Sequence, residues 1–549
     1  MEGEGLAHLG EEQKSNSSSR HAALIASGIF LSRIFGFLRE RAIAHYFGNS
    51  DLADAFKAAY RIPNFLQNLL GEGVLSASFI PVYAQLIALK KEQEAHELAA
   101  SIFWLLFGVV FSLSLVGVIF APHLIPLIAP GFQGEKLVVT TQLVQILFPG
   151  TALLVLSAWC LGILNTHAKF FLSYSAPVVW NFTQIAVLLF AAQRFMGFDL
   201  IASLAWSIFL GSLLQFLIQL PQVFKFIPSL WPKLKLSSAP RTVIRNFFPV
   251  LFSRGVVQVS AYVDIWLASL LPTGAVSSMS FAQMLYLLPV SLFGMSISAA
   301  ELPAMSKAQG SPAEIHELLR TRIISGCSRI AFFVIPSVAV FLLLGDALIA
   351  CVFQTGAFHH DNTLDVWRAL AGSSLGLLAA TMGRVYSSAF YALKDTRTPM
   401  KFALLRVALT IGLGYLMGLR LAPALQLNPM WGLSGLTASA GLAGWVEFWC
   451  LKISLERRIG STNFKRFFIL KLWGMALLSG ALGFACYHIV LKNLNVFLNG
   501  VLSLLIFSIS YILLAVLFKV EQAQRPFQMA MQKPIQKLVK RLRRGSKND

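Results

Sequence analysis

Residues 32–83 read SRIFGFLRERAIAHYFGNSDLADAFKAAYRIPNFLQNLLGEGVLSASFIPVY, a mostly apolar run that nevertheless carries charge. Its charged side chains include Arg33, Arg39, Glu40, Asp54, Lys57, Arg61 and Glu72. A charge at the centre of a bilayer costs about 2.5–3.5 kcal/mol on insertion scales, so charge within apolar helices indicates a functional site. The surrounding chain is typical of a membrane protein, and the run therefore predicts a polar, mainly cationic lining around a cavity.

The second half of this run places polar side chains near one helix face, at about 3.6 residues per turn. They are Asp54, Lys57, Arg61, Asn68 and Glu72. Pro63 is expected to interrupt that helix, because proline lacks a backbone N–H. Arg33 and Arg39 lie on the preceding helix, about 120° apart, so two helices are expected to contribute to the lining.

The composition predicts a polytopic all-α membrane protein. Only 13% of the 549 residues are charged, 56% are hydrophobic and the mean hydropathy is +0.67, whereas soluble proteins carry about 25% charge. Several apolar runs approach or exceed the roughly 20 residues needed to cross a bilayer. Examples are residues 102–121, 138–164, 201–220, 330–344 with its flanks, and 496–518. These runs are too long and too uniform for a β-barrel.

About fourteen membrane-spanning helices are predicted. The expected spans are 22–47, 52–88, 97–128, 137–165, 169–193, 200–226, 243–271, 276–306, 315–353, 364–392, 398–419, 431–456, 466–490 and 496–519. The second and eighth are long and are expected to be interrupted by prolines, Pro63 with Pro81 and Pro289 with Pro303. Broken helices are where many transporters place binding sites and moving parts.

The net charge is +20, and the basic residues gather in alternate loops between the apolar runs. This distribution is typical of membrane topology rather than of nucleic-acid binding. Loops 225–245, 394–401 and 456–466 are basic, whereas alternate loops such as HYFGNSD, LPTGA and FQTGAFHHDNT contain no Lys or Arg. The positive-inside rule places the basic loops, and with them both termini, in the cytoplasm. Residues 1–21 are interpreted as a cytoplasmic tail without a signal peptide, and 520–549 as a basic cytoplasmic tail.

A weak internal repeat divides the chain into two six-helix lobes. A Ser-Arg opening, an outer turn and a proline-containing long helix occur first from residue 32 and again from residue 253. The lobes are assigned to 22–226 and 243–457, joined by a basic linker at 227–242. Both begin on the same membrane side, so the repeat is parallel. The last two helices, in 458–519, lie outside it.

Enzymatic and metal chemistry find little support in the sequence. The chain has no Walker A, HExxH or CxxC motif, and its five cysteines are far apart. His359, His360 and Asp361 are interpreted as part of a solvated outer loop. No cofactor or metal site is expected, although Glu301 could titrate or could be a satisfied structural carboxylate.

The cations are the better indication of function. Arginine pairs bidentately with phosphate oxygens and keeps its charge when desolvated, so a cluster facing a cavity suits a diphosphate. The candidates are Arg33, Arg39, Lys57, Arg61 and Arg254. Each could instead extend to the membrane interface or pair with an acid. Asp54 could orient Lys57 or Arg61, or could cap the helix after the outer turn.

At these residues the chain resembles the MurJ (MviN) family, lipid II flippases of the MOP exporter superfamily. The resemblance covers about residues 22–520. It rests on SRIFGFLRE at 32–40, the run at 54–83, LYLLPVSLFG at 285–294 and ALKDTRTP at 392–399. It implies fourteen helices, with two six-helix lobes around a V-shaped cavity and two further helices forming a lipid-tail groove. It also implies a transporter rather than an enzyme.

The resemblance assigns substrate-binding positions residue by residue. It implies cavity arginines at Arg33 and Arg39, an acid at Asp54, the cation of a K/R-x-P-N pattern at Arg61, and the acid of an EG pair at Glu72. Two arginines usual in the family are replaced here by Gln67 and Met284. One hypothesis is that Arg254 restores positive charge to the second lobe.

The implied activity is movement of undecaprenyl-diphosphate-linked disaccharide-pentapeptide, lipid II, from the inner to the outer leaflet of the bacterial plasma membrane. Alternating access by a monomer is expected, driven by the membrane potential or by coupled Na⁺ or H⁺ at Asp264, Glu301 or Asp395. Lipid II, membrane lipids and the cell-wall synthesis machinery are the expected partners. The alternatives are an exporter of another polyprenyl-linked saccharide or drug-like cation, a polyprenyl-phosphate enzyme, and a non-transporting scaffold.

Overall fold

The computed structural model describes residues 27–231, 243–245, 247, 262–307, 310–463 and 466–524, and these contain helices but no strands. The chain divides into two units. The first comprises residues 1–277 with 355–358, and the second comprises 278–354 with 359–549. Residues 1–21 of the predicted N-terminal tail, residues 525–549 of the predicted C-terminal tail, residues 232–242 of the predicted linker and Arg254 lie outside the described residues.

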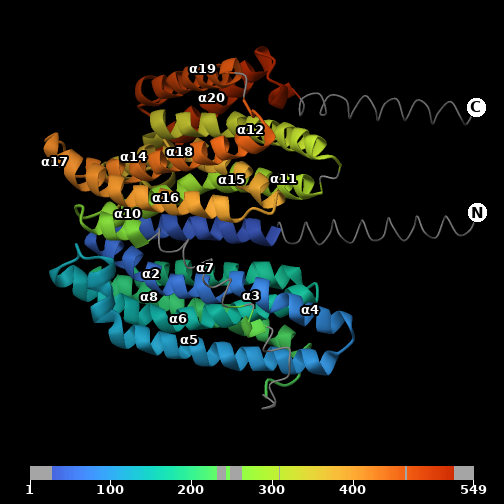
Figure 1. Cartoon of the computed structure of the whole chain (residues 1–549). Coiled ribbons are helices and arrows are strands. Elements are labelled where there is room, and N and C mark those ends of the chain that lie inside the picture. The colour runs from blue at the N-terminus through green and yellow to red at the C-terminus, as the bar shows by residue number, and fades with distance from the viewer. Residues whose placement is uncertain are drawn as a thin grey trace, which may run out of the picture. The chain divides into compact units, whose positions relative to one another are not determined.

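The first unit is a bundle of long helices (Figure 1). Residues 27–47 and 262–269 are helical. The other helices are α2 (Asp51–Leu70), α3 (Glu72–Ser78), α4 (Ile80–Ala88), α5 (Glu92–Ile128), α6 (Gly134–Thr166), α7 (Phe170–Ala191) and α8 (Gly197–Phe224). α6 lies at the centre, because it packs against α2, α5 and α8.

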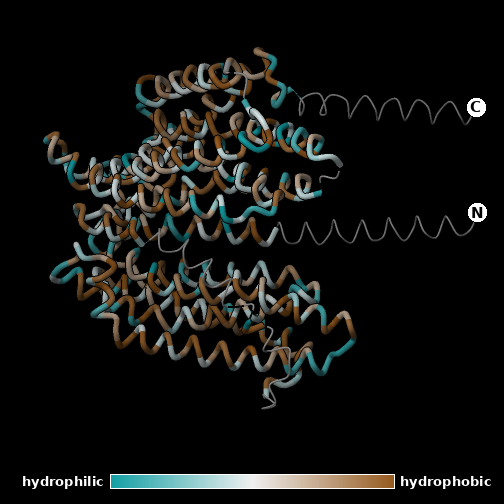
Figure 2. The backbone as a smooth tube through the Cα atoms, in the orientation of Figure 1, coloured by the Kyte–Doolittle hydropathy of each residue, from teal (hydrophilic) through white to brown (hydrophobic). Residues whose placement is uncertain are grey.

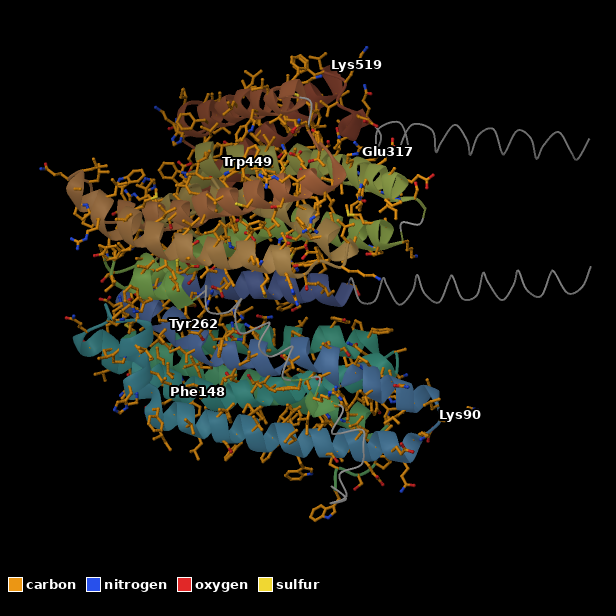
Figure 3. The ribbon with its side chains drawn as sticks, viewed as in Figure 1. Lys90, Phe148, Tyr262, Glu317, Trp449 and Lys519 are labelled. Atoms are coloured by element: carbon orange, nitrogen blue, oxygen red, sulfur yellow. The ribbon has the colours of Figure 1, made fainter. Side chains whose placement is uncertain are left out.

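Two contacts fix α5 against α6. The indole N–H of Trp159, a fully buried side chain, donates to the carbonyl of Ala99 at 3.1 Å. The ring of Phe148, labelled in Figure 3, lies so close to Gly117 that a Cβ there would come within 2.3 Å of it. Small residues allow such close approach between membrane helices.

The opposite surface of α5 is apolar and exposed. Figure 2 shows hydrophobic residues along most of this helix. The exposed side chains recur every three or four residues, as expected of one helix face: Trp104, Phe107, Phe111, Leu115 and Ile119. An exposed apolar surface of this length indicates contact with lipid hydrocarbon.

The second unit contains the remaining helices, and α10 begins in the first unit. They are α10 (Ala275–Pro289), η1 (Val290–Met295), α11 (Ser296–Ser306), α12 (Pro312–Leu343), α13 (Gly345–Phe353), α14 (His360–Ser374), α15 (Leu377–Ala392), α16 (Arg397–Gly414), η2 (Tyr415–Leu421), α17 (Ala422–Ala424), α18 (Trp431–Ile459), α19 (Arg466–Ala485), η3 (Cys486–Val490) and α20 (Val496–Leu517). α18 packs against α14, α15 and α16. α19 and α20 lie side by side (Figure 1). α19 also packs against α12, and α20 packs against α13.

The predicted fold class is confirmed. Helical residues occur in every one of the predicted spans. Within the described residues, ten helical runs are long and apolar enough to cross a membrane. The structure divides some predicted spans into two shorter helices; the span predicted at 364–392, for example, is formed by α14 and α15. Between them, Gly376 lies so close to α18 that a Cβ on Gly376 would come within 2.4 Å of the Cα of Gly441. The chain is a polytopic helical membrane protein.

The predicted helix interruptions are partly wrong. α2 continues through Pro63 and α11 continues through Pro303. Membrane helices tolerate proline, because neighbouring groups satisfy the freed carbonyl. The long second helix instead breaks at Gly71, where a Cβ would lie 2.3 Å from the carbonyl oxygen of Gln67. Pro289 ends α10 before a π-helical turn, and Pro81 lies in the first turn of α4.

The prediction of an outer loop at residues 359–361 is also wrong. His359 is the N-cap of α14, and its backbone N–H donates to the Asn362 side chain at 2.9 Å. His360 and Asp361 form the first turn of the helix and are exposed. Polar residues at this end are therefore part of a capped helix, a pattern that the apolar-run criterion does not detect.

A polar and aromatic contact joins the ends of α4 and α6. The Tyr83 hydroxyl lies 3.0 Å from Nε2 of His167, whose ring stacks on Phe226 with centroids 3.9 Å apart. His167 follows the last residue of α6, outside the spanning segment. Burial lowers the pKa of His167, His96 adds to this effect, and Glu92 opposes it.

Candidate functional site

The first unit contains a polar cavity of about 640 Å³. Its walls come from the 27–47 helix, α2, α3, α6, α7 and α8. The polar and aromatic lining residues are Ser32, Arg39, Tyr60, Asn64, Gln67, Asn68, Ser76, Ser157, Trp180, Asn181 and Gln215. The volume falls within the roughly 300–1,000 Å³ of small-molecule sites. Since most of these helices are candidate membrane spans, the cavity supplies a polar environment among apolar helices.

Among the described residues that line this cavity, Arg39 is the one cation. One terminal guanidinium nitrogen donates to Oδ1 of Asn181 at 3.0 Å, and the other donates to Oε1 of Glu40 at 2.7 Å. The guanidinium carbon lies 4.9 Å from the centroid of the Trp180 ring, within cation–π range. Nε is buried without a hydrogen-bond partner. Contacts from α7 therefore hold Arg39 in place, while its buried Nε–H meets no acceptor among the described residues.

Glu40 joins two cations from different helices. Besides accepting from Arg39, it forms an ion pair with Lys57 of α2, whose side chain is only 8% exposed. The three side chains carry a net charge of +1. Lys57 is not among the residues that line the cavity, so its position next to Glu40 gives it a charge-balancing contact rather than direct access.

Asp54 lies in a second buried polar cluster. Its side chain is 1% exposed, and it accepts hydrogen bonds from Nζ of Lys136 and from the backbone N–H groups of Gly274 and Ser277, each at 2.8 Å. Ser277 lies in the first turn of α10, so the carboxylate stabilises a helix N-terminus as well as a buried ammonium. Lys136 also pairs with the exposed Asp51 at 2.8 Å.

Both sequence-based interpretations of Asp54 are therefore wrong. The N-cap of α2 is Ser50, which accepts from the backbone N–H of Ala53 at 3.3 Å. The cation that Asp54 contacts is Lys136 of α6, distant in sequence, rather than Lys57 or Arg61. These contacts do not test the predicted role of Asp54 in substrate binding, which stays a prediction.

The other predicted site residues lie apart from the cavity or outside the described residues. Arg33 is exposed and follows the lining residue Ser32. Arg61 is partly buried, and its backbone carbonyl accepts from the hydroxyl of Tyr262 (Figure 3) at 3.3 Å. The structure brings neither arginine into the lining. The Glu72 side chain and all of Arg254 fall outside what the structure describes.

Several lining residues were missed by the sequence analysis. Asn181, Ser157 and Gln215 come from α7, α6 and α8, which are mostly apolar and contain few charged residues. A usable signal was present, because side-chain amides within long apolar helices are costly in lipid unless they meet a partner or a water-filled cavity.

The second unit contains an apolar groove of about 340 Å³. It is lined by α10, η1, α12, α13 and α20. Its lining includes Leu288, Leu292, Phe341, Leu504 and Phe507. The last of these helices, α20, belongs to the pair outside the predicted repeat, and an apolar groove of this kind suits hydrocarbon.

Glu301 and Asp395 lie in contrasting environments within the second unit. Glu301 is buried, lies 3.6 and 3.8 Å from the guanidiniums of Arg322 and Arg329, and has one oxygen without a hydrogen-bond partner. Asp395 lies in the turn between α15 and α16, outside the spanning segments. Hydrogen bonds from Thr398, together with Arg458, lower the pKa of Asp395 to about 2. Within the described residues, no group of His, Cys, Asp and Glu could hold a metal ion.

Comparisons with known proteins agree with the resemblance. The family model described as "Lipid II flippase MurJ" matches residues 43–511. The lipid II flippase MurJ of Burkholderia cenocepacia is 31% identical over 481 residues, covering 85% of this chain and 89% of that protein. A probable lipid II flippase MurJ of Rhizobium meliloti is 30% identical over 433 residues, covering 77% and 78%.

Solved structures show the same fold. A lipid II flippase MurJ in an inward closed conformation superposes with a TM-score of 0.73 at 25% identity, covering 90% of this chain and 98% of that one. An inward-facing multidrug resistance MATE transporter of the MOP superfamily gives 0.66 at 15% identity, covering 80% and 98%, which supports the fold alone. The named relatives are transporters rather than enzymes. With a family model matched along most of its length, and a relative that is 31% identical across 85% of it, this chain belongs to the MurJ family of lipid II flippases.

Proposed function

We propose that this protein flips lipid II from the inner to the outer leaflet of the bacterial plasma membrane by alternating access. Family membership supports the substrate, and the cavity of the first unit supports the mode of transport. A headgroup that bears a diphosphate and sugars cannot cross hydrocarbon unaided, because its polar groups would lose their hydrogen bonds to water. A polar cavity among membrane helices replaces those bonds.

The observation that carries the proposal is Arg39, which lines the cavity and keeps a buried Nε without a partner. A guanidinium has five N–H donors and stays charged when desolvated, so it can bind phosphate oxygens while Asn181 and Glu40 hold part of it. The Trp180 ring beneath the guanidinium adds to its orientation.

Release of the lipid follows from the same contacts. A transporter must bind its substrate weakly enough to let it leave. Glu40 already neutralises one of the two neighbouring cations, Arg39 and Lys57, so an arriving diphosphate meets a net charge of +1 rather than +2. When the lipid leaves, Glu40 remains beside Arg39 as its counter-ion, which lowers the electrostatic cost of emptying the cavity.

The polyprenyl tail is proposed to remain in an apolar environment throughout. The groove beside α20 offers one, since most of its lining is aliphatic or aromatic. We also propose that both termini face the cytoplasm, that the protein works as a monomer, and that it associates with lipid II, membrane lipids and the cell-wall synthesis machinery.

The driving force is proposed to be the membrane potential or a coupled Na⁺ or H⁺. Moving one elementary charge across a membrane potential of 100 mV changes the free energy by about 2.3 kcal/mol. Of the carboxylates considered, Glu301 suits ion coupling better than Asp395. Glu301 is buried with an unsatisfied oxygen, whereas a pKa of about 2 leaves Asp395 ionised at neutral pH.

The proposal is tested by measuring leaflet exchange of fluorescent lipid II in proteoliposomes with an imposed potential. Wild type should exchange the lipid much faster than empty vesicles. Arg39→Ala should slow exchange at least about ten-fold, the loss expected for one charge-assisted hydrogen-bond site, and Arg39→Lys should lie between the two. Arg420→Ala is the matched control, because that exposed arginine contacts Tyr415 in the second unit.

Two results would contradict the proposal. Exchange by folded wild-type protein that is no faster than in empty vesicles would exclude lipid II as the substrate. Equal rates for wild type and Arg39→Ala would exclude the cavity arginine as the diphosphate site.

A second candidate is a flippase for a different polyprenyl-linked saccharide. Gln67 lines the cavity where members of the family usually have an arginine, so the headgroup could differ from that of lipid II. Exchange of another undecaprenyl-diphosphate saccharide in preference to lipid II, in the same vesicles, would favour this candidate.

A further inference from the structure

Three side-chain amides that line the cavity of the first unit have no hydrogen-bond partner among the described residues. Asn64, Gln67 and Asn68 are spaced i, i+3 and i+4 on α2, so they share one face of that helix. Within the described part of the chain, none of the three side chains makes a hydrogen bond to another protein group.

Other amides of the same unit are used differently. Asn181 accepts from Arg39 and donates to the Pro177 carbonyl, and Gln219 donates to the Ser157 hydroxyl at 2.7 Å. The side chains of these amides form hydrogen bonds between helices or within one helix. The three on α2 do not, although polar side chains in membrane helices are retained mainly where they meet a partner or a ligand.

The chemistry of this face suits a neutral ligand. Each amide presents both a carbonyl acceptor and N–H donors, and Gln215 and Ser157 line the same cavity from α8 and α6. Sugar hydroxyls and acetamido groups need donors and acceptors together. A phosphate offers acceptors only and prefers cations, so the row of amides is a poor second phosphate site.

We propose that Asn64, Gln67 and Asn68 form a subsite for the saccharide of the lipid-linked substrate, next to a diphosphate held by Arg39. This inference rests on the proposed function and assigns the two chemical parts of the headgroup to different groups of one cavity. The volume of about 640 Å³ leaves room for sugar as well as phosphate.

The test is binding of three probes to the full-length protein in lipid nanodiscs. The probes are undecaprenyl diphosphate, the same lipid bearing the disaccharide, and the same lipid bearing the disaccharide and pentapeptide. Asn64→Ala, Gln67→Ala and Asn68→Ala should each weaken both saccharide-bearing probes about five-fold, the value of one neutral hydrogen bond, and leave undecaprenyl diphosphate unchanged. Arg39→Ala should weaken all three.

Two further variants control for folding and for non-specific effects. Gln93→Ala removes an exposed amide that donates to Glu97 on α5, and it should leave all three affinities unchanged. Gln67→Arg adds a cation and removes an amide, so it should tighten undecaprenyl diphosphate relative to the saccharide-bearing probes. This opposite change in selectivity cannot result from general unfolding.

Four outcomes would overturn the subsite. They are an equal loss for all three probes in the alanine variants, no loss for any, a loss confined to the peptide-bearing probe, and a Gln67→Arg variant with unaltered selectivity. The third would assign the amides to the peptide instead. Failure of the proposed function looks different, because wild type would then bind none of the three probes.

Discussion

Removal of the Asp54 carboxylate should be the most destabilising single change among the charged residues of the first unit. In Asp54→Ala the Lys136 ammonium loses its buried partner, and the backbone N–H groups of Gly274 and Ser277 lose their acceptor. Removing one partner of a buried pair costs about 3–5 kcal/mol. Asp51 still contacts Lys136, so we expect the lower part of this range.

Asp51→Ala is the matched control, because it removes a carboxylate from the same ammonium at the same 2.8 Å. The Asp51 side chain is 58% exposed, so solvent screens its pairing with Lys136 and the loss should stay within about 1 kcal/mol. The two variants therefore differ in burial while sharing their partner.

The assay is unfolding in mixed lipid–detergent micelles, with the Lys136→Met variant and the Asp54→Ala/Lys136→Met pair completing a double-mutant cycle. The double variant should be more stable than the sum of its parts predicts, by at least about 1 kcal/mol, because it no longer buries an unpaired ammonium. Equal effects of Asp54→Ala and Asp51→Ala, or strict additivity in the cycle, would refute the reasoning.

Three further predictions concern other parts of the chain. Gly71→Ala should lower the unfolding temperature and slow lipid exchange, because its Cβ would meet the Gln67 carbonyl oxygen at 2.3 Å, whereas Gly474→Ala, with open space around it, should change neither. Because burial holds the pKa of His167 below its unfolded value, its protonation opposes folding; stability is full above the unfolded pKa and falls as pH drops through it. Unfolding temperatures should therefore decline less between pH 7.5 and pH 5.5 in His167→Gln than in wild type, and an identical decline would contradict this. Under the proposed ion coupling, Glu301→Gln should remove the response of lipid exchange to an imposed Na⁺ or H⁺ gradient, and an unaltered response would assign the driving force elsewhere.

The spans were predictable from the sequence because the bilayer imposes one length and one hydrogen-bonding rule on all of them. The last helix, predicted at 496–519, is α20 at Val496–Leu517. The predicted helix ends are wrong where a helix extends beyond the hydrocarbon of the bilayer. α5 was predicted to begin at residue 97 but begins at Glu92, since acidic residues favour a helix N-terminus yet interrupt an apolar run.

The candidate site was predictable only in part, because periodicity shows which residues share a face but not what faces them. Arg39 lies in the lining, as the cationic-cavity prediction requires. Lys57 and Asp54 share a face of α2, yet their partners are Glu40 and Lys136 on other helices. Such pairings depend on tertiary packing, which no single helix encodes.

Two amides of the cavity, Asn181 and Gln215, were not predicted, for a related reason. The charged residues that predict a cavity lie in the first two helices, whereas Asn181 and Gln215 lie in apolar helices far along the chain. Their convergence depends on α7 and α8 packing together around α6. A search for uncharged polar residues within apolar spans would have found them, although not their grouping.

The central claim, that the cavity of the first unit holds the lipid headgroup, is tested most directly by photo-cross-linking. A photoreactive amino acid replaces the lining residue Ser76 in one variant and Leu127 in another. Leu127, 72% exposed near the end of α5, lies outside that lining. The account predicts a cross-link to lipid II from position 76 that excess unlabelled lipid II abolishes and that Arg39→Ala weakens, with little from position 127. Equal, non-competable cross-linking from both positions would contradict it.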